Sequence, residues 1–411
     1  NIIGNVPHLR FPEFSGEWEI CKVSELLDFY STNSLSWEQL EYGEKAMMNL
    51  HYGLIHVGLP TMVDLRRDKL PNVKEGNMPK NFELCKEGDV AFADASEDTN
   101  EVAKVIELFN LDNKDIVCGL HTIHGRDNKN KTIVGFKGYA FSSSAFHNQI
   151  RRIAQGTKIY SISTKNFSEC YVGIPSKAEQ TKIATLLRLI DERIATQNKI
   201  IEDLKKLKSA ISQLLLFKSD LLEKRIPLSE VSALKNGYPF LSSSYDSTGE
   251  YEVLTIANVT GERYICSEGC NRILTKPSDI QFHQTLKAND ILISLTGNVG
   301  RVSLCKEGKY LLNQRVGLLQ LNSAIVREFI YQVLSSRDFE QSMISCSQGA
   351  AQMNIGKGDV ENYIIPYSGN PKNLLKISSA LNSFDTKTLT ESRILQLLNR
   401  QKSHLLTSLF I

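Results

Sequence analysis

An internal repeat constrains the fold of this chain more than any other feature of its sequence. The segment Phe146–Gly156 matches Phe339–Gly349 at a constant spacing of 193 positions, with a Gln-Gly pair at the end of each. A strand-like run then leads to a proline in both copies, Pro175 in the first and Pro366 in the second. Repetition on this scale indicates a duplicated structural unit.

A long helical pattern follows each proline. Apolar residues recur in steps of three and four, which is the period of a coiled-coil seam. The seam positions are Ile183, Leu187, Ile190, Ile194, Ile201, Leu204, Ile211 and Leu215 in the first copy, and Ile377, Leu381, Phe384, Leu395, Leu398, Leu405 and Leu409 in the second. We predict helices over Glu179–Phe217 and Lys372–Phe410, each about 55 Å long at 1.5 Å per residue.

The two helical patterns are interrupted at the same places. Gln197 corresponds to Glu391 and Lys208 to Lys402, each pair 194 positions apart. Helices of this length need a partner for their apolar seam, and the other copy is the obvious one. We therefore expect antiparallel pairing of the helices, which would place a globular unit at each end and relate the two copies by a pseudo-twofold axis.

The rest of the chain reads as two mixed, strand-rich units. A turn of the form Lys-x-Gly/Asn-Asp precedes a strand-like run in each, at Lys86–Asp89 and at Lys287–Asp290. Elsewhere the two units differ greatly in sequence. The prediction is an α+β protein with globular domains over residues 1–155 and 223–348, a helical region over residues 156–222 and a second helical region over residues 349–411.

Composition narrows the possible partners only slightly. The formal net charge of this 411-residue chain is +2, so a surface that binds DNA would have to be locally basic. Of the eight cysteines only Cys266 and Cys270 are close together, and no second pair completes a zinc site. Free thiols in a reducing cytoplasm are the expectation. No apolar run approaches the length of a membrane span, so we expect no membrane partner.

The order of several short motifs resembles a known family over essentially the whole chain. These motifs are Trp18-Glu19, Lys86–Asp89, Glu179-Gln180 with Ile183, Leu189–Asp191, Lys287–Asp290, Thr296–Gly300 and Leu312–Val316. Together with the two Gln-Gly segments, they are similar to the specificity subunit of type I restriction–modification systems. The second copy departs from the pattern, because Asn373-Leu374 stands where Glu-Gln is expected, although Asp385 keeps the aspartate.

The resemblance implies a protein that reads DNA sequence and has no catalytic centre of its own. Each globular domain would be a target-recognition domain for one half of a bipartite, asymmetric site in double-stranded DNA. The helices would set the spacing between the half-sites and dock two methyltransferase subunits, which bind S-adenosylmethionine and methylate adenine. Two motor-nuclease subunits that use ATP and Mg²⁺ would complete a restriction enzyme, and whether they join stays open.

A search for chemistry in the chain itself finds little. The Asn/Asp-Pro-Pro-aromatic segment of an adenine methyltransferase is absent, and so is a phosphate-binding GxxxxGK[ST] loop. Asp279, Glu307 and Lys309 have the spacing of a magnesium nuclease, but the last two read better as a polar turn. His121 and His124 lack an evident third ligand. We expect no catalytic residue, bound cofactor or metal on this chain.

DNA contacts require cationic side chains for phosphates and Arg, Lys, Asn or Gln for base edges. Polar and basic loops supply such residues in both domains. The candidates are Arg66, Arg67, Lys69, Lys74, Arg126, Lys129 and Lys131 in the first domain, and Asn258, Arg263, Arg272, Lys276, Asn298, Arg301, Gln348 and Gln352 in or beside the second. Each of these loops can equally be a solvated turn.

Two rival hypotheses stay open beside the DNA reader. The first is a stand-alone magnesium nuclease that uses Asp279, Glu307 and Lys309. The second is a coiled-coil scaffold with no role in nucleic-acid binding. DNA footprinting separates the reader from the scaffold, and substitution of Asp279 with a cleavage assay separates the reader from the nuclease.

Overall fold

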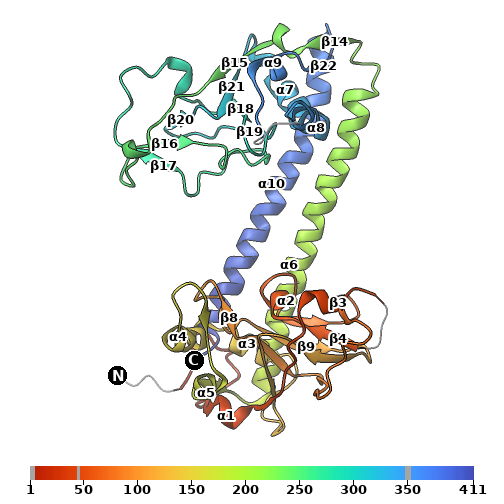
Figure 1. Ribbon diagram of the computed structural model, residues 1–411, viewed down its shortest axis with the longest axis vertical. Helices are drawn as coiled ribbons and strands as arrows, with labels where there is room; N and C mark the ends of the chain where they lie inside the picture. The colour runs from red at the N-terminus through yellow and green to blue at the C-terminus, as the bar shows by residue number, and fades with distance from the viewer. Residues whose placement is uncertain (1–4, 44–46, 348–352) are drawn as a thin grey trace. The chain divides into compact units, whose positions relative to one another are not determined.

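The computed structural model describes residues 5–43, 47–347 and 353–411, and its elements are labelled in Figure 1. The chain divides into two compact units. The first contains Asn1–Asn198 and Ile394–Ile411, and the second contains Lys199–Arg393. Because both divisions fall inside the long helices, each unit holds a globular part and a segment of each helix. The four domain boundaries proposed from the sequence stay predictions.

Two long helices form as the seam pattern predicts. The first, α6 (Lys177–Ser212), continues into a π-helical turn, η2 (Gln213–Phe217), and the second is α10 (Pro371–Ser408). With 36 residues, α6 is about 54 Å long at 1.5 Å per residue. These helices and the two strand-rich globular parts confirm the predicted α+β fold class.

In each unit, a segment of α6 packs against a segment of α10 from the opposite end. Ile183 and Leu187 belong to the same buried cluster as Leu405 and Leu409 in the first unit. In the second unit Leu216, which follows α6, shares a cluster with Leu374, Ile377 and Leu381 near the start of α10. Burial of these apolar side chains is the main favourable term that holds the helices against the globular parts.

The lysines that interrupt the two seams form matching ion pairs. Lys402 Nζ lies 2.6 Å from Asp191 Oδ1 in the first unit, and Lys208 Nζ lies 2.6 Å from Asp385 Oδ1 in the second. Both lysines lie close to a tyrosine ring, that of Tyr139 and that of Tyr331. The interruptions are therefore paired charges at the junction between helix and globular part, and they are repeated in both units.

The repeated Phe-containing segment is a capped helix in both units. In α4 (Ser144–Ile153) the hydroxyl of Ser143 accepts a hydrogen bond from Phe146 N, and in α8 (Arg337–Cys346) Ser336 does the same for Phe339 N. Both phenylalanines are fully buried. A serine cap satisfies an otherwise orphaned N–H of the first turn, so the repeat preserves a start signal as well as a core residue.

The described residues of the first unit form two larger sheets and two short strand pairs. The larger sheets have the orders β2-β11-β7-β9-β5 and β10-β4-β6-β3, and the pairs are β1-β13 and β12-β8. The strands are β1 (Glu19–Lys22), β2 (Asp28–Tyr30), β3 (Leu40–Glu41), β4 (Met47–Leu50), β5 (Met62–Asp64), β6 (Asn72–Val73), β7 (Val90–Ala93), β8 (Ala95–Ser96), β9 (Val105–Asn110), β10 (Asp115–Cys118), β11 (Thr122–Arg126), β12 (Tyr160–Ser161) and β13 (Tyr171–Ile174). Short helices connect them: α1 (Val23–Leu26), η1 (Trp37–Gln39), α2 (Tyr52–His56), α3 (Lys137–Phe141) and α5 (Thr164–Ser168).

The second unit has smaller sheets of different order, β15-β21-β18-β19 and β17-β16-β20, and the pair β14-β22. Its strands are β14 (Lys224–Pro227), β15 (Ser232–Asn236), β16 (Tyr251–Leu254), β17 (Asn271–Ile273), β18 (Ile291–Ser294), β19 (Val302–Leu304), β20 (Tyr310–Leu312), β21 (Val316–Leu321) and β22 (Ile364–Tyr367). The remaining helices are η3 (Leu228–Glu230), η4 (Ser242–Ser244), η5 (Phe282–Gln284), η6 (Ala324–Val326), α7 (Arg327–Leu334) and α9 (Lys357–Glu361). Helices α7 and α8 pack beside the helix segments, while β16, β17 and β20 lie on the other side of this unit (Figure 1).

A short antiparallel pair sits at the base of each long helix. Strand β13 comes directly before α6 and pairs with β1, with Glu19 opposite Ile174. Strand β22 comes directly before α10 and pairs with β14, with Lys224 opposite Tyr367. These pairs repeat in both units, whereas the larger sheets do not. In the described part of the chain, no helix combines the length and the apolar character that a bilayer crossing needs.

Candidate nucleic-acid interface

The clearest basic surface of the first unit is a hollow at the turn that follows β5. It has a volume of about 620 Å³, and four cationic residues, Arg66, Arg67, Lys69 and Lys114, line it. The first three were predicted from the sequence. Lys114 was not predicted; it comes from the turn between β9 and β10 and donates a hydrogen bond to the carbonyl oxygen of Leu65 at 2.9 Å. These cations form a local positive surface of the kind that contacts DNA phosphates.

Buried leucines and backbone hydrogen bonds anchor the turn that carries these cations. Leu65 and Leu70 are buried, and between them the backbone N–H groups of Arg67 and Asp68 donate to the carbonyl of Asp64. Arg66 forms a hydrogen-bonded ion pair with the Asp64 carboxylate, which lowers the pKa of that carboxyl. Arg66 and Arg67 stay 61% and 50% exposed at their side chains, so both guanidinium groups are accessible from solvent.

Three other candidates of the first unit are tied to the protein by their amino groups. Lys74 donates to the carbonyl of Glu38, and Lys129 donates to the carbonyl of Glu25 at 2.7 Å. Lys131 pairs with Glu19 at 2.6 Å, and this hydrogen bond raises the pKa of the lysine. Lys129 is exposed and the other two are half-buried. Their amino groups therefore already have partners within the unit, although only Lys131 is paired with a carboxylate.

Arg126 requires a correction. It was expected on a surface loop, but it is the last residue of β11 and only 6% of it is exposed. Its guanidinium forms two hydrogen bonds of 2.8 Å with Asp89 and one of 2.7 Å with Glu83. The hydrogen bonds with Asp89 are the largest cause of its raised pKa. We assign Arg126 a structural role, because its charge is already neutralised inside the domain.

Two candidates of the second unit also turn out to be internal. Asn258 is 4% exposed, and its side chain accepts from Thr255 N at 2.8 Å and donates to the Cys266 carbonyl at 2.9 Å. This arrangement closes a loop from within. Arg263 has a side chain only 12% exposed, and it pairs with Glu328 and Asp385. Burial opposes the charge of Arg263, but the hydrogen bonds with Glu328 outweigh it, so its pKa is raised. Both residues were expected at the surface, and both organise the domain instead.

The remaining candidates of the second unit are accessible. Arg272 is 47% exposed at its side chain and pairs with Glu252, and Lys276 is exposed with its amino group 5.0 Å from the ring centre of Tyr251. Asn298 is exposed. Arg301 lines a separate hollow of about 230 Å³ with a side chain that is 38% exposed. The structure does not gather these four residues into one pocket, and Gln348 and Gln352 lie outside the described residues.

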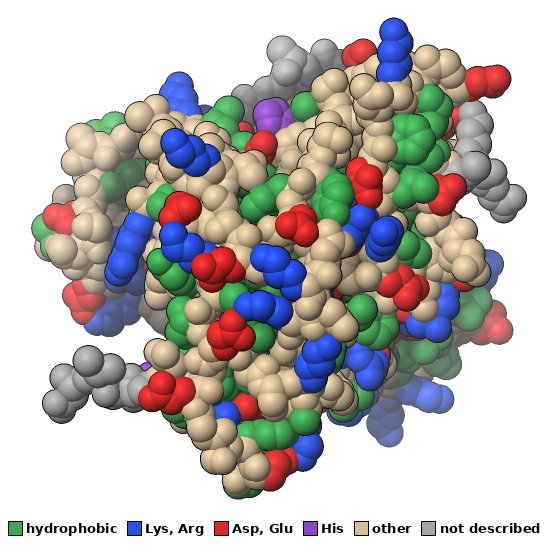
Figure 2. Space-filling model, turned by 90° about the horizontal axis from the view of Figure 1, so that it is seen from below, with side chains coloured by type: hydrophobic (Ala, Val, Ile, Leu, Met, Phe, Trp, Pro, Cys, Tyr) green, Lys and Arg blue, Asp and Glu red, His purple; other side chains and the backbone are tan. Residues whose placement is uncertain are grey.

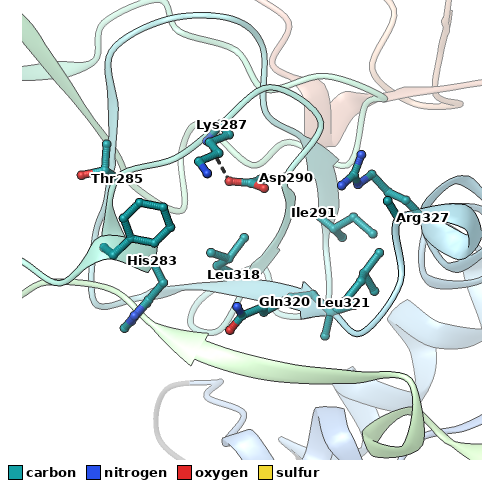
Figure 3. A pocket seen from close by; sticks show the side chains of 12 residues that line it. His283, Thr285, Lys287, Asp290, Ile291, Leu318, Gln320, Leu321 and Arg327 are labelled. Carbon is teal, nitrogen blue, oxygen red and sulfur yellow. Dashed lines mark hydrogen bonds between the residues drawn. The ribbon is translucent and has the colours of Figure 1, made fainter.

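A further hollow in the second unit has a volume of about 280 Å³ and lies beside the Lys287–Asp290 turn (Figure 3). Asp290 and Arg327 come from one side of it, and His283 and Gln320 from another. The Asp290 carboxylate accepts a hydrogen bond from the backbone N–H of Lys287 at 2.7 Å. Burial raises the pKa of Asp290. The lining of the hollow mixes polar and charged side chains with apolar ones.

Charges of both signs are mixed over the surface. On the face that Figure 2 shows, Lys and Arg side chains are interspersed with Asp and Glu side chains. This agrees with the formal net charge of only +2. Binding to a polyanion would therefore depend on local groups, such as the four cations at the turn after β5, and not on a uniformly positive surface.

The residues of the rival nuclease hypothesis do not form a metal site. Asp279 accepts a hydrogen bond from the Tyr238 hydroxyl at 2.8 Å, and Lys309 pairs with Glu250. Among the residues that the structure describes, only Cys85, Cys118 and His124 form a group of three or more side chains placed to share a metal ion. Neither Asp279 nor Glu307 belongs to it, so the geometry gives the nuclease hypothesis no support.

Comparison with known proteins identifies the family. A family model described as "Type I restriction modification DNA specificity domain" matches residues 68–206 and 223–400, and so covers both copies of the repeat. The chain belongs to this family. A search of curated protein sequences gave no match.

Two solved structures share the fold of this specificity subunit. The type I restriction–modification S subunit from M. genitalium is 17% identical, with a TM-score of 0.58 and coverage of 99% of each chain. A chain from a study of complex assembly and conformational transition in a type I system is 14% identical, with a TM-score of 0.58 and coverage of 95% of this chain and 96% of that chain. The family recognises DNA sequence and is non-catalytic, as the motif order predicted.

Proposed function

We propose that this specificity subunit reads a bipartite, asymmetric site in double-stranded DNA, with one globular part for each half-site. The observation that carries the proposal is a repeated framework beneath unlike domains. The Lys–Asp ion pairs at Lys402–Asp191 and Lys208–Asp385 match in the two units, as do the capped helices α4 and α8. The sheets of the two globular parts differ in strand number and order. Two different readers on one framework fit a target with two different halves.

Within each reader, the exposed cations are proposed to position the DNA backbone. In the first domain these are Arg66, Arg67 and Lys69, joined by Lys114 in the same hollow. In the second they are Arg272, Lys276 and Arg301, with Asn298 as a candidate for base contact. Phosphate contacts fix orientation, whereas contacts to base edges specify sequence. Lys74, Lys129 and Lys131 are secondary candidates, because their amino groups already have partners within the unit.

The long helices are proposed to dock two methyltransferase subunits in the cytoplasm. Leucines on their outer faces are about half exposed, among them Leu189 at 53%, Leu207 at 50% and Leu397 at 56%. Exposed leucines along a helix fit a surface that a partner protein covers. The methyltransferases would bring S-adenosylmethionine, and motor-nuclease subunits, where they join, would bring ATP and Mg²⁺. In this proposal the chain supplies DNA recognition, and the partner subunits supply S-adenosylmethionine, ATP and Mg²⁺.

Helix length is proposed to set the spacing between the half-sites, and an insertion tests this directly. One heptad added after Asn198 keeps the seam in phase and lengthens α6 by about 10.5 Å at 1.5 Å per residue. Since DNA rises about 3.4 Å per base pair, the spacer in the methylated motif should grow by at most about three base pairs. Methylome sequencing of a host that expresses the variant with its methyltransferase gives the motif.

A two-residue insertion at the same place is the matched control. It turns the following seam by about 200° and should abolish stable pairing of the helices, and with it methylation. An active heptad variant with an unchanged spacer would show that the helices do not measure the distance.

A further inference from the structure

We infer that Cys85, Cys118 and His124 form a binding site for a thiophilic metal ion of the Zn²⁺ class inside the first recognition domain. Their ligand atoms all lie within 4.8 Å of one another. All three residues are buried, with exposed fractions of 6%, 2% and 1%. The residues come from the segment before β7, the end of β10 and the middle of β11, so an ion would link both larger sheets of the unit.

The spacing of the two sulfurs fits a shared ion. Cys85 Sγ and Cys118 Sγ are 3.6 Å apart, and both cysteines are free thiols. Two thiolates about 2.3 Å from a tetrahedral zinc lie about 3.8 Å from each other, close to the observed separation. A disulfide needs about 2.05 Å, so the sulfurs would have to approach by about 1.5 Å.

The histidine offers an independent observation. His124 has a side chain with 0% exposure, and its Nδ1 has no hydrogen-bond partner. A buried polar atom without a partner costs free energy and is uncommon in a native protein. The other ring nitrogen, Nε2, lies 2.7 Å from Asp89 Oδ2. With Nε2–H donated to the carboxylate, Nδ1 carries the lone pair that a metal ion would accept.

Asp89 and Arg126 supply the support that metal-bound histidines usually have. A carboxylate that accepts the second N–H of a ligand histidine fixes the ring and makes it a better ligand. Asp89 is itself held by two hydrogen bonds from Arg126 and one from the backbone N–H of Lys86. Charges also balance, because two thiolates neutralise a divalent ion while Arg126 neutralises Asp89. Such compensation is what permits this many charged groups below the surface.

The ion would stabilise the domain beneath the basic hollow. Cys85 and Cys118 belong to the same buried cluster as Leu65 and Leu70, the residues that anchor the turn bearing Arg66 and Arg67. Because two of the three ligands are cysteines, Co²⁺ bound in place of Zn²⁺ should report on the site through thiolate charge-transfer absorption. This inference concerns the chain itself and does not depend on the proposed bipartite DNA site.

The test uses the full chain, purified under a non-chelating reductant and stripped of metal. Anaerobic titration with Co²⁺ should give one equivalent with a charge-transfer band in the near ultraviolet, and Zn²⁺ should displace it. Cys85→Ser and Cys118→Ser should each lose the band, and Asp89→Asn should weaken binding about 10–100-fold with the ligands intact. Cys170→Ser, which alters another buried cysteine of the same unit, should bind like the wild type.

A second measurement needs no variant. Wild-type protein loaded with Zn²⁺ should release one ion when a mercurial thiol reagent reacts with Cys85 and Cys118, after the accessible thiols such as Cys346 have reacted. Failure of the reduced wild type to bind Co²⁺ or Zn²⁺ at micromolar concentration would overturn the inference. So would metal binding that survives both cysteine substitutions, or a Cys85–Cys118 disulfide in protein isolated anaerobically without metal.

Discussion

Asp89 and Asp290 occupy the same turn in the two units. In each, the backbone N–H of the lysine three residues earlier donates to the Asp Oδ2, at 2.8 Å from Lys86 and at 2.7 Å from Lys287. A buried strand follows in both cases, β7 in the first unit and β18 in the second. Beyond the turn the two aspartates differ. Asp89 is covered and meets His124 and Arg126, whereas Asp290 faces the hollow of Figure 3.

The difference shows how one framework supports two unlike domains. Burial opposes ionisation of Asp89, but hydrogen bonds from His124 and Arg126 outweigh it, and its pKa is lowered. Burial also acts on Asp290, and without comparable donors it raises the pKa. The turn and its aspartate are therefore shared by the two units, and only the surroundings of the carboxylate differ. The same position anchors a polar core in the first unit and lines an open hollow in the second.

The largest expected effect is the loss of the polar core of the first unit. Asp89→Ala should destabilise that unit by about 3–5 kcal/mol, because Arg126 and His124 lose their main buried partner. The only tryptophans, Trp18 and Trp37, belong to the first unit, so tryptophan fluorescence during urea unfolding reports on it alone. Asp290→Ala is the matched control and should leave the fluorescence transition unchanged. Equal shifts in the two variants would remove the contrast between the turns.

A smaller difference is expected between the two repeated ion pairs. Lys402→Met should cost about 1.5–3 kcal/mol, because among the described residues Asp191 then keeps the hydrogen bond from the Tyr139 hydroxyl but no cationic partner. Lys208→Met should cost about 1 kcal/mol, because Asp385 keeps the hydrogen bonds from Arg263 and Gln332. Methionine preserves most of the lysine stem in both cases. Unfolding monitored by circular dichroism gives the two values, and a larger cost for Lys208→Met would reverse the argument.

The smallest effect is a pH dependence at Asp290. Its pKa is higher in the folded protein than in the unfolded chain, so its favourable contribution is present in acid and is lost as pH rises through the folded pKa. At neutral pH the ionised carboxylate is therefore the less stable form. Asp290→Asn keeps an acceptor for Lys287 N and should be slightly more stable than the wild type at neutral pH. The gap in unfolding midpoint should close on acidification towards about pH 4, and a gap that widens would contradict the assigned cause.

The helical framework could be predicted from sequence because its signals are local and repeated. The seams of α6 and α10 follow a period, and the matched interruptions at Lys208 and Lys402 were visible as an alignment. Their chemical role was not, because each partner aspartate lies on the other helix. Asp191 meets Lys402, and Asp385 meets Lys208, only once the helices pair.

The candidate DNA contacts could be predicted less well, and the reason is specific. Arg126 and Asn258 stand in polar, glycine-containing segments that look like exposed turns, yet the structure buries both. The local residue composition cannot distinguish a strand end whose side chain joins a buried ion pair from a solvated loop. Lys114 and the cluster around His124 were missed for a related cause. Cys85 and Cys118 are 33 positions apart, and only the bridge between Leu84 and Val117 brings their segments together.

The central claim is that each globular part reads its own half of the target. Exchanging residues 232–347 for the corresponding domain of another specificity subunit tests it most directly. The exchange leaves the first unit, α6 and α10 unchanged. Methylome sequencing of a host that expresses the chimera with its methyltransferase should show one half-site replaced, the other retained and the spacer preserved. A chimera that methylates a motif changed in both halves, or in neither, would contradict the account.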